Sequence, residues 1–403
     1  MFKVGLEVLL ESPEKIALLN GKRVAYLGHP ASVNRHLGHG LDLLYAHPAI
    51  DLTAGFGPQH GILGEKQDNM IESDTFIDPF YKIPMYSLYG EVRRPTEEMM
   101  ESFDVILIDL QDVGCRIYTY LTTMIYVMEE SARLGKEVWI LDRPNPAGRP
   151  VEGVYLSDSQ YTFVGATRVP IRHGLTMGEL ALWVKQSHNL QNLKLTVMEM
   201  EDYDPERGPG FGWPVGEMSW INPSPNLSNF YSTRSFCGSV LFEGTKLSEG
   251  RGTTRALEQF GAPGMKGHEI LEEMRRQAPE VLQGVLVRPC FFEPTFQKHK
   301  GQLCGGVALH VDDETYYQHQ LFQPFRFCSL ALKVIHTLYP EFDLWQVPPY
   351  EYETEKMPVD MLSGSEELRL WVEDETKGFS DWHQRLQQDE EDWLEKRKKF
   401  LLY

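Results

Sequence analysis

Polar side chains that could bind or cleave a sugar recur after successive apolar runs of this chain. They are Gln59 and His60; Glu72; Asp109, Gln111, Asp112, Arg116 and Tyr118; Arg143 and Asn145; Arg172 and His173; and Glu243, Glu249 and Arg251. Carboxyl groups can act as acids, bases or nucleophiles, and a guanidinium group matches a carboxylate in a bidentate way. This recurrence, more than any single residue, favours a functional site.

Several of these residues also have a structural alternative. A single Asp at the end of a strand, such as Asp112, more often caps a turn than reacts. His60 and His173, taken singly, are typical of hydrogen-bonded structural histidines. A metal hydrolase that uses His60, Asp112 and His173 is a further alternative, because these residue types suit a divalent ion. No tight ligand spacing supports it, and we expect no metal.

The elements that must position these residues alternate in type. Short apolar runs at 24–27, 51–58, 104–114 and 136–146 predict strands, and the periodicity at 37–46, 122–134 and 177–186 predicts helices. This alternation predicts an α/β fold with a parallel sheet. Ligands of such sheets bind beside the loops at the carboxyl ends of the strands, where the polar groups lie.

From about Phe236 the sequence changes in texture. A segment rich in Gly, Ser and Thr is followed by predicted strands at 284–288 and 305–311 and a predicted helix at 325–338. We expect three parts: an α/β domain at 1–232, a smaller α+β domain at 233–345 and a helical tail at 346–403. The tail carries an apolar stripe that predicts packing against the body, formed by Trp382, Leu386, Trp393 and Phe400.

Composition excludes several classes of partner. The 403 residues are 42% hydrophobic and 24% charged, the ordinary mix of a globular protein. A formal net charge of −19 opposes binding to nucleic acid or to an anionic membrane. The first twenty residues carry charges through their apolar stretch, so we expect no signal peptide and a cytoplasmic location. Five widely spaced cysteines predict free thiols and not disulfides or a zinc site.

Several long motifs give the chain a family resemblance. It is similar to the exo-β-N-acetylmuramidase family of glycoside hydrolases, through FGPQHGILG (56–64), YSLYG (86–90), DLQDVGCRIYTYLTTM (109–124), LDRPNP (141–146), VPIRHGLTMGEL (169–180), PSPN (223–226), LFEGTKLSEGRGTTR (241–255), FGAP (260–263) and LCGGVALHV (303–311). The resemblance implies a Rossmann-like domain joined to a smaller domain, with the active-site cleft between them. It also implies that N-acetylmuramic acid is removed from the non-reducing end of peptidoglycan fragments without a cofactor.

The chain departs from this family at one position. Family members commonly carry Glu where this chain has Gln59, and that Glu is the natural candidate for the catalytic acid. An amide cannot donate a proton as a carboxylic acid does. Another carboxyl therefore acts here, or this branch uses a different substrate or binds sugar without cleaving it. For catalysis we expect Glu72 and Glu249, with Asp112 and Glu243 in reserve.

The remaining residues of the predicted site would bind the substrate. Arg116 or Arg251 is expected to receive the lactyl carboxylate of muramic acid. Hydroxyl and acetamido groups are expected to meet Gln59, His60, Tyr118, Asn145, His173 and Asn226, with Glu243 also at the site. The acetamido group could itself supply the nucleophile, and the sequence does not choose between these routes.

Overall fold

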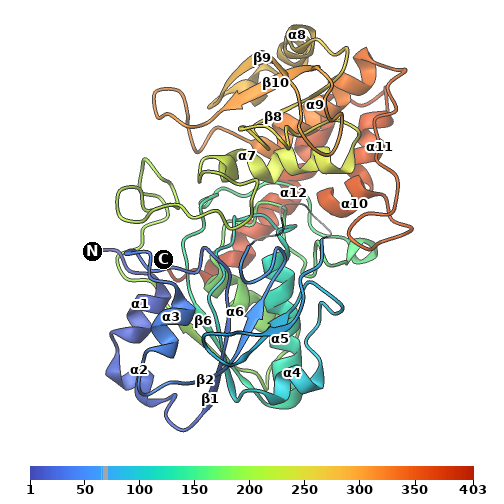
Figure 1. The fold of residues 1–403 in the computed structure, drawn as a ribbon. Coiled ribbons are helices and arrows are strands. Elements are labelled where there is room, and N and C mark those ends of the chain that lie inside the picture. The colour runs from blue at the N-terminus through green and yellow to red at the C-terminus, as the bar shows by residue number, and fades with distance from the viewer. Residues whose placement is uncertain (65, 67–70) are drawn as a thin grey trace.

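The computed structural model describes residues 1–64, 66 and 71–403 (Figure 1). The sheet of the first domain has seven strands. Their order is β3-β4-β2-β1-β5-β6-β7, and every pairing is parallel except that of β3 with β4. The strands are β1 (Arg23–Leu27), β2 (Asp51–Gly57), β3 (Phe76–Ile77), β4 (Pro84–Ser87), β5 (Val105–Ile108), β6 (Glu137–Leu141) and β7 (Lys194–Met198). The predicted parallel α/β sheet is confirmed.

Both faces of this sheet are buried, which explains the continuous apolar runs. On β5, Ile106 and Ile108 join one core, and Val105 and Leu107 join the other. The surrounding helices are α1 (Gly5–Leu10), α2 (Pro13–Ala17), α3 (Gly40–Tyr45), α4 (Glu97–Glu101), α5 (Thr119–Leu134) and α6 (Met177–Ser187). Residues of α1 to α3 belong to the second core, and those of α4 to α6 belong to the first.

The predicted start of α6 is confirmed at atomic level. The Thr176 hydroxyl accepts a hydrogen bond from the backbone N–H of Glu179 at 3.3 Å, and the Glu179 carboxylate accepts one from the backbone N–H of Thr176 at 2.9 Å. This reciprocal capping box satisfies two backbone donors at the start of the helix.

The second domain is built on a small antiparallel sheet of order β8-β10-β9. Its strands are β8 (Gln259–Ala262), β9 (Leu286–Phe292) and β10 (Cys304–His310), and its helices are α7 (Ser232–Ser239), α8 (Gly267–Gln277), α9 (Pro324–Leu338), α10 (Pro358–Ser363) and α11 (Glu367–Glu373). Short 3-10 helices occur at η1 (Asp158–Gln160), η2 (Val240–Gly244), η3 (Pro279–Leu282) and η4 (Lys398–Phe400). The predicted fold class, a Rossmann-like domain with a smaller α+β domain, is confirmed.

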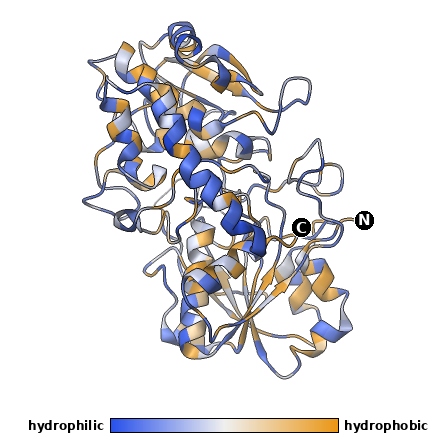
Figure 2. Ribbon diagram, turned by 180° about the vertical axis from the view of Figure 1, so that it is seen from behind, coloured by the Kyte–Doolittle hydropathy of each residue, from blue (hydrophilic) through white to orange (hydrophobic). Residues whose placement is uncertain are grey.

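The last long helix, α12 (Phe379–Arg397), runs from the small domain to the large one (Figure 1). Its outward side is hydrophilic in Figure 2. At one end Trp382 stacks on Trp371 of α11, with ring centroids 5.4 Å apart. At the other end Trp393 packs edge-on against Trp183 of α6 at 4.8 Å. The predicted apolar stripe is therefore buried, and it connects the two domains.

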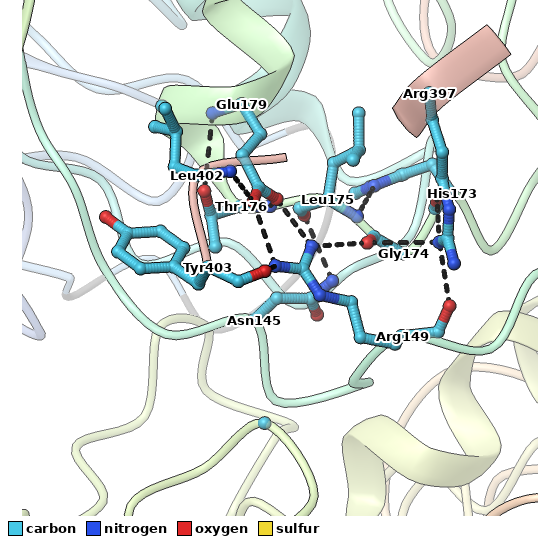
Figure 3. A network of polar contacts seen from close by, with 12 residues as sticks. Asn145, Arg149, His173, Gly174, Leu175, Thr176, Glu179, Arg397, Leu402 and Tyr403 are labelled. Atoms are coloured by element: carbon cyan, nitrogen blue, oxygen red, sulfur yellow. Dashed lines mark hydrogen bonds and ion pairs between the residues drawn. The ribbon is translucent and has the colours of Figure 1, made fainter. Parts of the chain in front are cut away.

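The end of the chain is held at the start of α6 by a polar network (Figure 3). The Arg149 guanidinium donates to both carboxylate oxygens of Glu179, at 2.6 and 2.9 Å, and to the backbone oxygen of Tyr403 at 3.0 Å. Glu179 also accepts the backbone N–H of Leu402 at 2.8 Å. Because Arg397 of α12 donates to the backbone oxygen of Arg149 at 2.7 Å, the same network anchors the helix.

Among the described residues, no helix is both long and apolar enough to cross a membrane.

Candidate active site between the domains

A pocket lies between the two domains and takes its walls from both. The large domain contributes Gln59, His60, Ile117, Tyr118, Thr119, Val164, Ser224 and Asn226, and the C-terminal part contributes Phe236, Glu243, Arg251, Leu257, Tyr350 and Glu351. Its volume of about 40 Å³ is far below that of usual ligand sites. A sugar ring therefore requires the walls to separate, as in enzymes that close over their substrates.

Six of the residues predicted to bind sugar meet in this pocket. They are Gln59, His60, Tyr118, Asn226, Glu243 and Arg251. The first two follow β2 in a tight turn, where His60 has a φ of 71° and Gly61 a φ of 81°. A Cβ on Gly57 would lie 2.6 Å from the backbone nitrogen of Ile62, so the close return of this turn requires glycine there.

Three other residues predicted to bind sugar do not line the pocket. Arg116 is buried and donates to the backbone oxygens of Val154, Val169 and Leu362, the last of which belongs to α10. The Asn145 side chain bonds to the backbone of its own loop and to Leu175, and the His173 ring accepts from the Leu175 N–H at 3.2 Å. These contacts give all three structural roles, and their part in substrate binding stays a prediction.

Two of the predicted catalytic carboxyls lie beside the pocket and not in its lining. Glu249 is buried, with its oxygens 2.9 Å from the Arg251 Nε and 2.7 Å from the Lys298 Nζ. Burial alone would raise the pKa of Glu249, but Lys298 and Arg251 together hold it below its usual value, so this group stays ionised. Glu72 is half-exposed, and it accepts the Tyr352 hydroxyl at 3.1 Å. Their catalytic roles remain predictions.

Asp112, the third predicted carboxyl, is buried near His173. Its Oδ2 accepts the backbone N–H of Gly114 at 2.7 Å and lies 3.7 Å from the His173 Nε2. Burial raises the pKa of Asp112 to about 7 and lowers that of His173 to about 3. His173 is therefore uncharged at neutral pH. No group of three or more His, Cys, Asp or Glu side chains within 1–64, 66 and 71–403 is placed to hold a metal, so the metal-hydrolase alternative gains no support.

Replacing Asp112 with Asn is expected to make unfolding less dependent on pH. In the folded protein Asp112 keeps its proton up to about pH 7, whereas in the unfolded chain it loses the proton at about pH 3.9. The stability of the wild type therefore falls as the pH rises from about 4 through 7. The variant should gain about 1 kcal/mol relative to wild type between pH 6 and pH 8. Urea denaturation at both pH values measures this change, and an equal difference at the two pH values would contradict it.

Two further residues of the lining, Tyr350 and Glu351, were not predicted from the sequence. The Tyr350 hydroxyl donates to Glu243 at 2.8 Å. The Glu351 carboxyl accepts the Gln59 amide at 3.3 Å and the Tyr89 hydroxyl at 2.8 Å. Burial and the nearby Glu243 raise the pKa of Glu351 to about 7. The pair of prolines before Tyr350 indicates a loop, but nothing in the local sequence places that loop against β2.

Arg251 lines the pocket and forms ion pairs with two carboxylates, Glu243 in the lining and Glu249 beside it. Its Nη2 lies 2.5 Å from Glu243 and its Nε 2.9 Å from Glu249. These two carboxylates raise the pKa of Arg251 even though burial opposes the charge. A carboxylate on a substrate would meet a guanidinium group that already holds two protein carboxylates.

The fold and the site together define a two-domain α/β protein with a carboxyl-lined pocket between the domains. Residues 24–231 match the family model for the N-terminal domain of the exo-β-N-acetylmuramidase NamZ. Residues 234–403 match the family model for the C-terminal domain of the same family. The chain belongs to the NamZ family of exo-β-N-acetylmuramidases.

Relatives match over the whole chain. The chain is 37% identical to the peptidoglycan β-N-acetylmuramidase NamZ of Bacillus subtilis, and the match covers 100% of this chain and 91% of that protein. Two crystal structures of DUF1343 family proteins from Bacteroides fragilis share the fold. One has a TM-score of 0.85 at 30% identity and the other a TM-score of 0.75 at 27%; each match covers 100% of this chain and 99% of the neighbour.

Proposed function

We propose that this protein hydrolyses peptidoglycan fragments and releases N-acetylmuramic acid from their non-reducing ends. The observation that carries the proposal is the pocket between the two family domains, which is lined by the carboxyls of Glu243 and Glu351 and by the amide of Gln59, in contact with Glu351. Glycoside hydrolysis usually requires two carboxyl groups at one site, and this pocket supplies them. The 37% identity to the muramidase of Bacillus subtilis supports the same reaction.

The shape and lining of the pocket suit the end of a glycan. A small pocket between two domains, once its walls have separated, suits one terminal sugar better than the middle of a chain. Tyr118, Asn226 and His60 would bind its hydroxyl and acetamido groups, and Arg251 would attract the lactyl carboxylate. Glu249, paired with Arg251, and the half-exposed Glu72 would act as catalytic carboxyls from beside the pocket.

The proposed substrate is a small carbohydrate, and the proposed place of action is the cytoplasm. All five cysteines are buried free thiols, which is the usual state of cysteines in a reducing compartment. A cytoplasmic enzyme of this kind would act on wall fragments that have been taken up for recycling. Cell fractionation with an antibody to the protein tests this location.

A disaccharide with N-acetylmuramic acid at its non-reducing end tests the reaction. Incubation should yield free N-acetylmuramic acid and N-acetylglucosamine, detected by mass spectrometry, whereas the disaccharide with the sugars in the opposite order should remain intact. A second candidate function, sugar binding without cleavage, is favoured by Gln59, since the family resemblance implies Glu at this position. Saturable binding of the disaccharide without any product would establish that alternative.

A further inference from the structure

The loop that carries Glu351 has an unusual backbone for its sequence. Glu351 and Tyr352 follow one another with φ values of 44° and 69°, in the left-handed region that non-glycine residues seldom occupy. The loop is fixed by reciprocal backbone hydrogen bonds between Tyr350 and Glu353, both at 2.9 Å. Such unfavourable conformations gather at functional sites, where the surrounding structure holds them in place. Here the conformation places the Glu351 carboxyl in the pocket, with the residue 5% exposed.

The Glu351 carboxyl is held from the opposite domain by Gln59. The Thr119 hydroxyl donates to the Gln59 Oε1 at 2.6 Å, and this bond turns the Gln59 Nε2 toward the Glu351 Oε1, 3.3 Å away. The Tyr89 hydroxyl donates to the other oxygen at 2.8 Å. Both donors are uncharged, so they orient the carboxyl without requiring that it be ionised.

The charged groups around Glu351 act in opposite directions. Burial is the largest influence and raises its pKa, and the carboxylate of Glu243 adds to this effect. The Tyr89 and Gln59 hydrogen bonds and the more distant charge of Arg93 act to lower it. The balance leaves the pKa at about 7, so a substantial fraction of Glu351 is protonated at neutral pH. A general acid works best when its pKa lies near the working pH.

We propose that Glu351 is the general acid of the reaction and that Gln59 is its positioning residue. The assignment rests on the proposed glycosidase function. The resemblance to the family places a Glu at position 59, and in this chain the acid would come from the other side of the same contact. Gln59 and Glu351 are in contact across the domain boundary. The contact therefore still includes a carboxyl that can donate a proton, but in this chain that carboxyl is at position 351 and not at position 59.

The chemical step balances as a hydrolysis. The bond between the anomeric carbon and the glycosidic oxygen breaks, and its electron pair stays on the leaving oxygen, which takes the proton of Glu351. The anomeric carbon then receives the oxygen of a water molecule, either directly or after temporary capture by the acetamido oxygen of the substrate. The proton released by that water restores Glu351.

Substrates with different leaving groups test this assignment. A dinitrophenyl muraminide needs no protonation of its leaving group, whereas a disaccharide does. Glu351→Gln should lower kcat/KM on the disaccharide by about 1,000-fold and on the dinitrophenyl substrate by less than about tenfold. The wild-type rate on the disaccharide should fall as the pH rises above about 7, and this fall should disappear in the variant. Glu355→Gln, an exposed substitution in the same loop, is the matched control and should be unchanged.

The exchange of the two side chains tests the role of Gln59. The double variant Gln59→Glu/Glu351→Gln keeps a carboxyl–amide pair at the contact and returns the acid to position 59. Its kcat/KM on the disaccharide should be at least about tenfold higher than that of Glu351→Gln. A merely structural role of the pair would not predict this recovery.

Three results would overturn the assignment. A wild type active on the disaccharide, with Glu351→Gln within about tenfold of it, would remove the acid role and leave the proposed function intact. Equal losses on both substrates would likewise show that Glu351 does not act by protonation. A wild type inert on both substrates would overturn the proposed function and the assignment together.

Discussion

Replacing Arg251 with Met should lower the free energy of unfolding by about 3 kcal/mol and kcat/KM by about 100-fold or more. Arg251 is buried, and its guanidinium group separates the carboxylates of Glu243 and Glu249. Met keeps the volume but leaves Glu243 without this cation and Glu249 with Lys298 alone. Uncompensated buried charge is among the most destabilising changes in proteins.

Arg255→Met is the matched control for this substitution. Arg255 pairs with Glu258 and Asp312, but its side chain is 36% exposed. Its loss should cost less than the loss of Arg251, because solvent screens its pair with Asp312 and the buried Glu258 keeps a hydrogen bond from the Asn229 amide at 3.2 Å. Urea denaturation and steady-state kinetics measure both variants. An Arg251→Met protein as stable as the Arg255→Met protein would contradict the account.

The same substitution tests how the lactyl group is recognised. If Arg251 attracts the substrate carboxylate, Arg251→Met should raise the Kd of N-acetylmuramic acid more than that of N-acetylglucosamine, which lacks this group. An equal change in the two Kd values would remove Arg251 from that role and leave its part in pocket stability.

Replacing Arg326 with Met should destabilise the protein by about 3 to 5 kcal/mol. Arg326 of α9 makes a bidentate ion pair with Glu390 of α12, at 2.7 and 2.8 Å, and lies 3.6 Å from Glu152 of the large domain. Glu390 in turn accepts the backbone N–H of Gly153 at 2.9 Å. The cluster joins the two domains and α12 in the interior, so its loss should also reduce the activity of a pocket built from both domains.

Two further variants separate the causes of this loss. Arg385→Met removes a partly exposed arginine of α12, paired with Glu367, and should cost less than about 1 kcal/mol. The double variant Arg326→Met/Glu390→Met removes both charges of the main pair and should regain part of the stability lost in the single variant. A double variant less stable than Arg326→Met would contradict this explanation, and thermal or urea unfolding distinguishes the outcomes.

The fold was predictable because its strands bury both faces. A run such as that of β5 has no polar alternation, so it indicates a covered parallel strand even without knowledge of its neighbours. The antiparallel strand β8 was missed, since its four residues follow a Gly-rich segment and carry no periodic signal. Helix α3 begins at Gly40, later than predicted, because Leu37 adopts a φ of 64° in the preceding turn.

The site was predictable only in part, since residue type does not show where a side chain points. Gln59 and Asn145 follow strands in similar loops, but Gln59 faces the pocket and Asn145 bonds to its own loop. Glu351 lies 292 positions from Gln59 in the chain, in a segment assigned to a tail. A contact of that range depends on the packing of both domains, which no local pattern encodes.

The most direct test of the account is the rate on two chromogenic glycosides, one of β-N-acetylmuramic acid and one of β-N-acetylglucosamine. The wild type should hydrolyse the muramic acid glycoside and leave the glucosamine glycoside almost untouched. Inactivity on both, together with a gain of activity in Gln59→Glu, would contradict the account and identify a branch of the family that binds without cleaving.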